Sequence, residues 1–301
     1  MQKGINQWSL PITNDFESVL RLSAASGIPN VEFCILPAQE ELFPKVKVDP
    51  ELQQLYANVA ATVNAANYKV TLTDSAEELR RLRQSVEKAG VRVMSVTTLD
   101  LFRYTLTSDN PAVRDAAVWV IKRMVEICSI LGGNIVLIEP GVVSSTLPYR
   151  DAYRNCEAAL RQTVRYAEEH NITLALENVW GKFLMSPTEF CALIDGMNSE
   201  AVGAYFDVAN ILAFGYPQDW ILHLGKRIRS LHFKDFRHAP GGMSGFCNPF
   251  DGDVDWAAVK GALRQIGYSG YVVAEVILPR VWQDGFIAEL SRKLDWFLGE
   301  L

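Results

Sequence analysis

The architecture of this chain follows from Ile172-Thr173-Leu174-Ala175-Leu176-Glu177, a short apolar run that ends in a carboxylate. A run of this length and composition predicts a strand that is buried on both faces, as in a parallel sheet covered by helices. The polar residues 168–171 mark its upstream boundary. Because functional residues of α/β folds lie at the carboxyl ends of strands, Glu177 is a candidate site residue.

Three later stretches repeat this pattern of an apolar strand followed by a side chain that can bind a metal. The strands predicted over 202–206, 228–231 and 271–274 are followed by Asp207, His232 and Glu275. Each residue alone has another interpretation: Asp207 as the N-cap of a helix, His232 as a core histidine, and Glu275 as a solvent-facing strand end. Four successive strand ends of this kind favour a common site.

The remainder of the chain alternates predicted strands and helices. Strands are expected over residues 3–8, 30–36, 91–97 and 134–138. Helices are expected over residues 16–25, 51–66, 76–89, 112–131, 149–170, 187–196, 209–224 (interrupted near Gly215 and Pro217), 256–267 and 283–298. Asn14 is the expected N-cap of the first helix, and Ser75 with Glu78 forms a capping box for the third.

Eight strands, each followed by a helix, predict a closed (β/α)8 TIM barrel. We expect residues 1–301 to form a single (β/α)8 barrel domain, with an insertion around residues 37–75 after the second strand. A doubly wound open sheet is the alternative. However, the chain has no G-x-G-x-x-G turn after a strand.

Bulk composition excludes several functional classes. The formal net charge is −6, which gives no basic footprint for nucleic acid. The five cysteines are widely spaced and form no C-x-x-C pair, which predicts reduced thiols. The N-terminus has no signal-peptide pattern, and no apolar run approaches the roughly 18 residues of a membrane helix. These features predict a cytoplasmic protein without a membrane partner.

Glu177, Asp207, His232 and Glu275 together predict a metal site. Three carboxylates and one imidazole suit Mn²⁺ or Mg²⁺, with Co²⁺ or Zn²⁺ as substitutes. Burying three carboxylates without a cation would be very unfavourable.

Four motifs around these residues resemble those of the sugar phosphate isomerase/epimerase family within the xylose-isomerase-like TIM-barrel superfamily. They are Leu176-Glu177-Asn178, Tyr205-Phe206-Asp207-Val208-Ala209-Asn210, Leu231-His232-Phe233-Lys234-Asp235 and Ala274-Glu275-Val276. The similarity is to the D-tagatose 3-epimerase and L-ribulose-5-phosphate 3-epimerase type. It implies one divalent metal ion, Mn²⁺ above all, held by the quartet. Glu177 and Glu275 would also act as acid and base.

The resemblance implies a ketose 3-epimerase that acts on a small-molecule sugar or sugar phosphate. The reaction would proceed by proton abstraction and return through a metal-stabilised enediolate. Members of the family are often dimers or tetramers, so a homo-oligomer is expected. The chain departs from the D-tagatose 3-epimerase pattern at Asn210, where that pattern has a histidine. Arg237 lies one residue out of register with the family arginine.

Other residues near strand ends are candidate substrate contacts. Lys182, Lys234 and Arg237 could reach a substrate phosphate, and Asn178 and Asn210 could orient ligands or hydroxyls. Trp8, Phe102, Trp180 and Phe183 could form an apolar wall. Glu32, inside the second strand, is expected to pair with an arginine, whereas Glu139 is a further candidate for the site. The glycine-rich loop 241–245 could act as a lid.

Several alternatives stay open at this stage. The same barrel and metal support an aldose–ketose isomerase, or a dehydratase of the inosose type. An endonuclease IV-like hydrolase would need many more ligands than a chain with four histidines offers. A sugar-binding barrel without turnover is the remaining alternative, and the intact quartet argues against it.

Overall fold

A computed structural model describes residues 1–11, 15–38, 42–44, 46–61 and 67–299. Within them, eight parallel strands form a closed barrel, because β1 pairs with both β2 and β11. These strands are β1 (Gln2–Asn6), β2 (Asn30–Leu36), β4 (Arg92–Thr98), β5 (Ile135–Ile138), β6 (Thr173–Glu177), β7 (Val202–Asp207), β8 (Ile228–Phe233) and β11 (Tyr271–Ala274). The predicted (β/α)8 barrel is confirmed.

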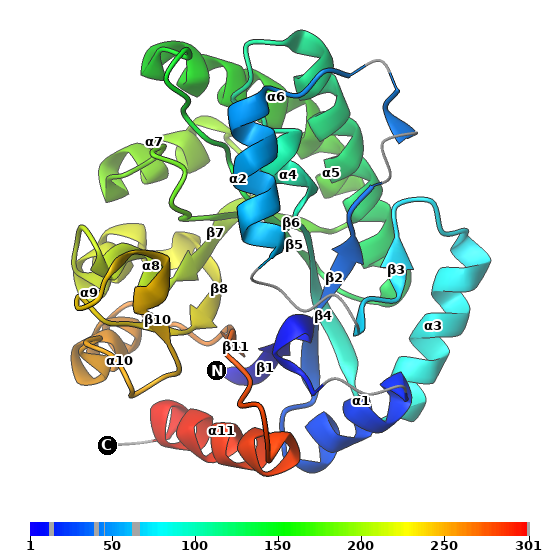
Figure 1. The fold of residues 1–301 in the computed structure, drawn as a ribbon, viewed down its shortest axis with the longest axis vertical. Helices are drawn as coiled ribbons and strands as arrows, with labels where there is room; N and C mark the ends of the chain where they lie inside the picture. The colour runs from blue at the N-terminus through cyan, green and yellow to red at the C-terminus, as the bar shows by residue number, and fades with distance from the viewer. Residues whose placement is uncertain (12–14, 39–41, 45, 62–66, 300–301) are drawn as a thin grey trace.

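Helices lie around the strands, as Figure 1 shows. They are α1 (Phe16–Ala25), α2 (Pro50–Ala60), α3 (Ala76–Lys88), α4 (Asp100–Arg103), α5 (Pro111–Leu131), α6 (Tyr149–Glu169), α7 (Pro187–Gly196), α8 (Val208–Leu212), α9 (Pro217–Leu224), α10 (Trp256–Gln265) and α11 (Gln283–Leu298). Short strands add to the frame: β3 (Val70–Thr71) pairs with β2, and β9 (Asp235–Phe236) pairs with β10 (Phe246–Cys247). None of the described helices is long and apolar enough to span a bilayer.

Local signals account for most element boundaries. The capping box of Ser75 and Glu78 starts α3 as predicted. The first strand is shorter than predicted, because the Asn6 side chain accepts a hydrogen bond from Trp8 N and starts a 3₁₀ turn. Asp15 caps α1, whereas Asn14 lies outside the described residues. The helix predicted over 51–66 ends at Ala60 in the described part, and residues 62–66 lie outside it.

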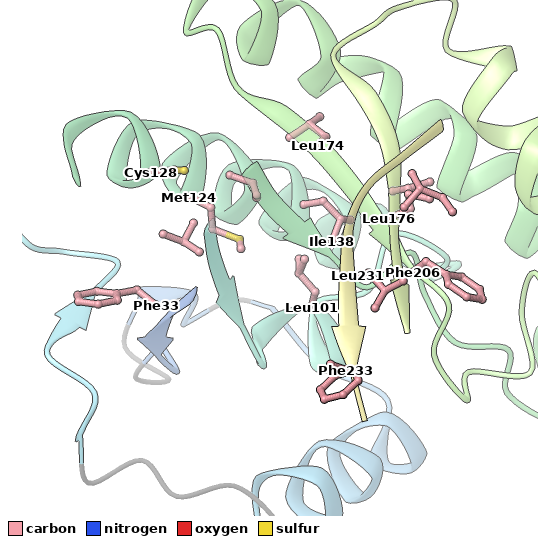
Figure 2. Packing of buried hydrophobic residues seen from close by; sticks show 14 of the residues in the cluster. Phe33, Leu101, Met124, Cys128, Ile138, Leu174, Leu176, Phe206, Leu231 and Phe233 are labelled. Carbon is pink, nitrogen blue, oxygen red and sulfur yellow. The ribbon is translucent and has the colours of Figure 1, made fainter. Parts of the chain in front are cut away.

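The barrel core consists of two layers of apolar side chains. Residues such as Leu174, Leu176 and Leu231 pack outward into the large cluster between strands and helices (Figure 2). A second, smaller cluster consists of Met94, Ile135, Leu137, Ala175, Tyr205 and Val273. Because side chains alternate along a strand, the residues two positions beyond members of this inner cluster share its face.

This alternation places the polar strand ends inside the barrel. Glu177 follows Ala175 by two positions, Asp207 follows Tyr205, and Glu275 follows Val273. Glu139 has the same relation to Leu137. The apolar inner layer therefore forms the floor beneath a group of acidic side chains at the carboxyl end of the barrel.

Candidate active site

Four side chains from consecutive barrel strands converge at this end. Glu177 ends β6, Asp207 ends β7, His232 lies on β8, and Glu275 directly follows β11. Each offers one potential ligand atom, and these four atoms lie within 4.8 Å of one another. The structure thus brings the predicted quartet together.

His232 is held from both sides of its ring. Its Nδ1 lies 2.9 Å from Glu177 Oε1, 3.3 Å from Glu275 Oε2 and 3.8 Å from Asp207 Oδ2. Its Nε2 lies 3.1 Å from Oε1 of Glu32, on β2. When one ring nitrogen of a histidine binds a metal, a carboxylate that contacts the other ring nitrogen fixes the orientation of the imidazole. The ring therefore presents Nδ1 to the three carboxylates.

The two carboxylate oxygens of Asp207 have different environments. Its Oδ1 accepts a hydrogen bond from the backbone N–H of Asn210 at 2.8 Å and so caps α8. Its Oδ2 is buried and has no hydrogen-bond partner. The side-chain amide of Asn178 forms two hydrogen bonds with the backbone of Asp207. Asn178 Oδ1 accepts from Asp207 N at 2.9 Å, and Asn178 Nδ2 donates to Asp207 O at 2.8 Å. The helix cap and the site position are thus compatible, because each uses a different oxygen.

Lys234 adds a cation at the edge of the quartet. Its Nζ lies 2.9 Å from Glu275 Oε1 and 3.6 Å from Asp207 Oδ2. The ammonium also lies 4.4 Å from the centre of the Phe246 ring. Lys234 was predicted as a phosphate contact, whereas in this arrangement it forms an ion pair with Glu275.

Burial and mutual repulsion perturb the titration of the cluster. Burial raises the pKa of Glu177 to about 7, although contact with His232 opposes the shift. Burial also raises the pKa of Asp207. Burial disfavours the His232 cation, but Glu32 and Glu275 outweigh it and raise the pKa of His232 well above its usual range. Burial therefore opposes ionisation of the Glu177 and Asp207 carboxyl groups, whereas the neighbouring carboxylates favour the His232 cation.

The residues fit a divalent metal ion. Three carboxylates and one imidazole nitrogen are a ligand set suited to Mn²⁺, Mg²⁺, Co²⁺ or Zn²⁺. Asp207 Oδ2 is buried without a hydrogen-bond partner, and it lies 3.6 Å from the Lys234 ammonium and 3.8 Å from His232 Nδ1. A buried carboxylate oxygen that makes no hydrogen bond is stabilised when a cation binds it.

A cavity of about 890 Å³ opens over the cluster. Glu177, His232, Glu275 and Lys234 line its polar part. Trp8, Phe102, Trp180 and Phe246 are among the apolar residues of its wall. Its volume is in the range of small-molecule sites.

The structure separates the predicted substrate contacts into two groups. Trp8, Asn210 and Lys234 line the cavity, and Asn178 lies behind Asp207. Lys182 and Arg237 are exposed and are not among the lining residues of the described chain. The guanidinium of Arg237 donates from Nε to Asp251 O at 2.6 Å, so its side chain is turned away.

Some, but not all, of the residues predicted for the apolar wall and the lid loop line the cavity. Phe102 and Trp180 line the cavity, but Phe183 is buried against Tyr149 and Tyr153. In the predicted lid loop, Met243 lines the cavity and is 57% exposed. Closure of that loop stays a prediction.

Two glutamates belong to the site more closely than the sequence indicated. Glu32 was expected to pair with an arginine, and this is wrong: it contacts His232, Asn6 and Ser95. Glu139 follows β5, lines the cavity and is 4% exposed. A signal for both was available, since a carboxylate within or directly after an apolar strand needs a partner inside the barrel.

Comparison with known proteins identifies a family of TIM barrels. A sequence model of the family described as xylose isomerase-like TIM barrel matches residues 59–295. An L-ribulose-5-phosphate 3-epimerase of Shigella flexneri is 23% identical over 248 residues, which cover 79% of this chain and 83% of the relative.

Solved structures show the same fold. A D-psicose 3-epimerase studied in the presence of D-fructose has a TM-score of 0.70 at 17% identity, with 100% of both chains covered. An IOLI protein with a bound zinc atom has a TM-score of 0.71 at 16% identity, also with 100% of both chains covered. At these sequence identities, the similarity shows a shared fold.

Proposed function

Since the chain belongs to the xylose isomerase-like TIM barrel family, we propose that it is a divalent-metal-dependent ketose 3-epimerase. The substrate is a free or phosphorylated ketose, the class named for the L-ribulose-5-phosphate 3-epimerase relative and the D-psicose 3-epimerase neighbour. Mn²⁺ is the proposed ion, and Glu177, Asp207, His232 and Glu275 are the proposed ligands.

One observation carries this proposal. Two glutamates, Glu177 and Glu275, line one cavity and lie on opposite sides of Asp207 and His232 in the order of barrel strands. Inverting a carbon centre requires a proton to leave one face and another to arrive at the opposite face. A pair of carboxyl groups that flanks the substrate meets this requirement.

Glutamate side chains of the protein carry out both proton transfers. One glutamate takes the proton from the carbon beside the ketose carbonyl, and the electron pair of the C–H bond forms an enediolate. The other, in its protonated form, returns a proton to the far face of the same carbon. The chemistry that a divalent ion supplies when bound is polarisation of the carbonyl oxygen, which makes the neighbouring C–H more acidic.

Other residues position these groups. Glu32 orients His232, and Asn178 fixes the backbone of Asp207. The Lys234 ammonium holds Glu275 Oε1 at 2.9 Å. Apolar side chains such as Trp8 and Phe102 cover part of the cavity and limit the access of water to the reacting carbon.

Solvent-deuterium exchange tests the proposal. The Mn²⁺-loaded protein is incubated in D₂O with D-psicose, D-tagatose, L-ribulose and L-ribulose 5-phosphate, and label at C3 is followed by NMR. We expect incorporation at C3 together with the 3-epimer. Glu177→Gln and Glu275→Gln should each lower the rate by about 10²–10⁴-fold. Label at C1 would instead indicate an aldose–ketose isomerase, and absence of exchange with all four ketoses would reject the epimerase.

A further inference from the structure

We propose that Glu139 is a substrate-binding residue that forms a hydrogen bond with one hydroxyl of the sugar and thereby selects among ketoses. This inference rests on the proposed function, because it takes the ligand of the cavity to be a ketose. It assigns to the site a further acidic side chain, beside the three carboxylates of the proposed ligand quartet.

The position of Glu139 is that of a functional residue. It directly follows β5, and β5 is the neighbour of β6 in the barrel. It stands two positions after Leu137, a member of the inner apolar cluster, so its side chain shares the inner face with Glu177. It lines the same cavity as Glu177 and Glu275.

One oxygen of the Glu139 side chain lacks the partner that a structural role would provide. Glu139 is 4% exposed, and its Oε2 is buried without a hydrogen-bond partner. Glu32, another glutamate in the barrel interior, is 0% exposed and is hydrogen-bonded to Asn6, Ser95 and His232. A buried oxygen without a partner is unfavourable and rare, so a role in stability alone does not account for it.

A role as a metal ligand is not supported either. The ligand atoms that lie within 4.8 Å of one another in the described chain are those of Glu177, Asp207, His232 and Glu275, and Glu139 is not among them. A carboxyl group that lines the cavity, has one oxygen without a partner and stands outside the ligand set is best explained by a ligand that brings its own polar group. Ketose hydroxyls can both donate to and accept from a carboxyl group.

The strand order also indicates which part of the sugar is bound. Glu139 lies on the side of Glu177 that is remote from Asp207, His232 and Glu275. Its neighbours on the cavity wall, Thr97 and Leu99, come from the end of β4. The hydroxyl therefore belongs to the end of the sugar that extends past Glu177. The terminal torsion of a glutamate is soft, so either carboxyl oxygen can turn to meet it.

Calorimetric binding to the Mn²⁺-loaded full-length protein tests this inference without requiring turnover. The probes are D-psicose, D-tagatose, L-ribulose and L-ribulose 5-phosphate, followed by the monodeoxy analogues of the tightest binder. Wild type should bind one analogue about tenfold more weakly than the parent sugar. Glu139→Leu should bind the parent about tenfold more weakly than wild type and should no longer discriminate against that analogue. Glu139→Gln, which keeps hydrogen-bonding atoms, should stay within about threefold of wild type.

A stability measurement separates recognition from a structural role. Removing a buried oxygen that has no partner should leave the melting temperature of ligand-free Glu139→Leu unchanged or higher, whereas removing a structural residue lowers it. A lower melting temperature with unchanged discrimination among analogues would overturn the inference. Absence of binding of every probe to wild type would overturn it as well.

The outcomes for Glu139 and for the epimerase proposal are distinguishable. Deuterium exchange in wild type, with equal sugar binding by wild type and Glu139→Leu, would leave the epimerase standing and reject the role of Glu139. Sugar binding that depends on Glu139, without exchange at C3, would support this role and reject the epimerase.

Discussion

The Nε2 atom of His232 lies 3.1 Å from Oε1 of Glu32, although the two residues are 200 positions apart in the chain. The contact spans the inside of the barrel from β8 to β2. It leaves Nδ1 to face Glu177, 2.9 Å away. The site therefore depends on a glutamate that belongs to no predicted ligand set.

Replacement of Glu32 should weaken metal binding. We expect Glu32→Gln to lower the affinity for Mn²⁺ about 10–100-fold, because the imidazole loses the carboxylate that orients it. Calorimetric titration of metal into the metal-free protein measures the change. Ser95→Ala, which removes a hydrogen bond to the other oxygen of Glu32 and leaves the Oε1 contact with His232 in place, is the control and should change affinity far less. Equal affinities for Glu32→Gln and wild type would show that His232 is held in place by packing.

Removal of the Lys234 charge should strengthen metal binding. The ammonium lies 2.9 Å from Glu275 and 3.6 Å from Asp207, so it repels a divalent cation and competes for its ligands. We expect Lys234→Met to raise Mn²⁺ affinity about tenfold or more. The same variant should melt at a lower temperature without metal, since it leaves buried carboxylates without their counter-charge.

Lys293→Met is the matched control for that experiment. The Lys293 side chain is 19% exposed, compared with 17% for Lys234, and its ammonium also lies near a phenylalanine ring, that of Phe250. It does not line the site cavity. Its replacement should leave metal affinity unchanged, and a similar gain in both variants would refute a local electrostatic effect.

Metal binding should stabilise the protein and release protons. At a metal concentration about 100 times the Kd, the free energy of unfolding should rise by about 2.7 kcal/mol, and EDTA should reverse the change. Because the pKa of Glu177 is about 7 without metal, its carboxyl group is largely protonated at pH 6 and must lose that proton to bind a cation.

Calorimetry in buffers of different ionisation enthalpy counts these protons. More protons per metal should be released at pH 6 than at pH 8, and Glu177→Gln should reduce the difference. A proton count that is the same at both pH values in wild type would contradict the prediction.

Glu139 should make the metal-free protein less stable as pH rises. Burial, reinforced by the charge of Glu177, raises the pKa of Glu139 well above its usual range. The folded state therefore keeps a proton that the unfolded state loses above its own, ordinary pKa. For one such proton the free energy of unfolding falls by about 1.4 kcal/mol per pH unit until the folded-state pKa is reached.

Urea unfolding of the metal-free protein between pH 5 and pH 8 measures this slope. The free energy of unfolding of Glu139→Gln should fall less steeply with pH than that of wild type, by up to that amount. Glu200→Gln is the control, because the Glu200 side chain is 98% exposed and its replacement should leave the slope unchanged. Parallel curves for wild type and Glu139→Gln would show that the Glu139 carboxyl ionises as readily in the folded protein as in the unfolded chain.

Local sequence predicted the barrel and the quartet because both depend on short-range patterns. An apolar run such as 172–176 specifies a buried strand, and the residue that ends it lies at the carboxyl edge of the sheet whatever the remainder of the chain does. That inference does not require knowing which strands pair with one another in the barrel. Helix caps such as Ser75 with Glu78 are equally local.

The substrate side of the site was less predictable, since loop residues follow no hydrophobic periodicity. Lys182 and Arg237 have the same spacing from strand ends as true lining residues, yet both are exposed. Their side-chain directions depend on contacts such as that of Arg237 with Asp251 O, which sequence spacing does not encode.

By itself, the amino-acid sequence determined that this chain is a parallel (β/α)8 barrel with three carboxylates and an imidazole at successive strand ends. Only the tertiary structure decided that Glu32 contacts His232, that Lys234 pairs with Glu275, and that Glu139 lines the cavity with one carboxyl oxygen unpaired. The physical reason is that strand formation follows from the hydrophobic period of a few neighbouring residues. Contacts across the barrel exist only after closure sets the register of strands that are far apart in the chain.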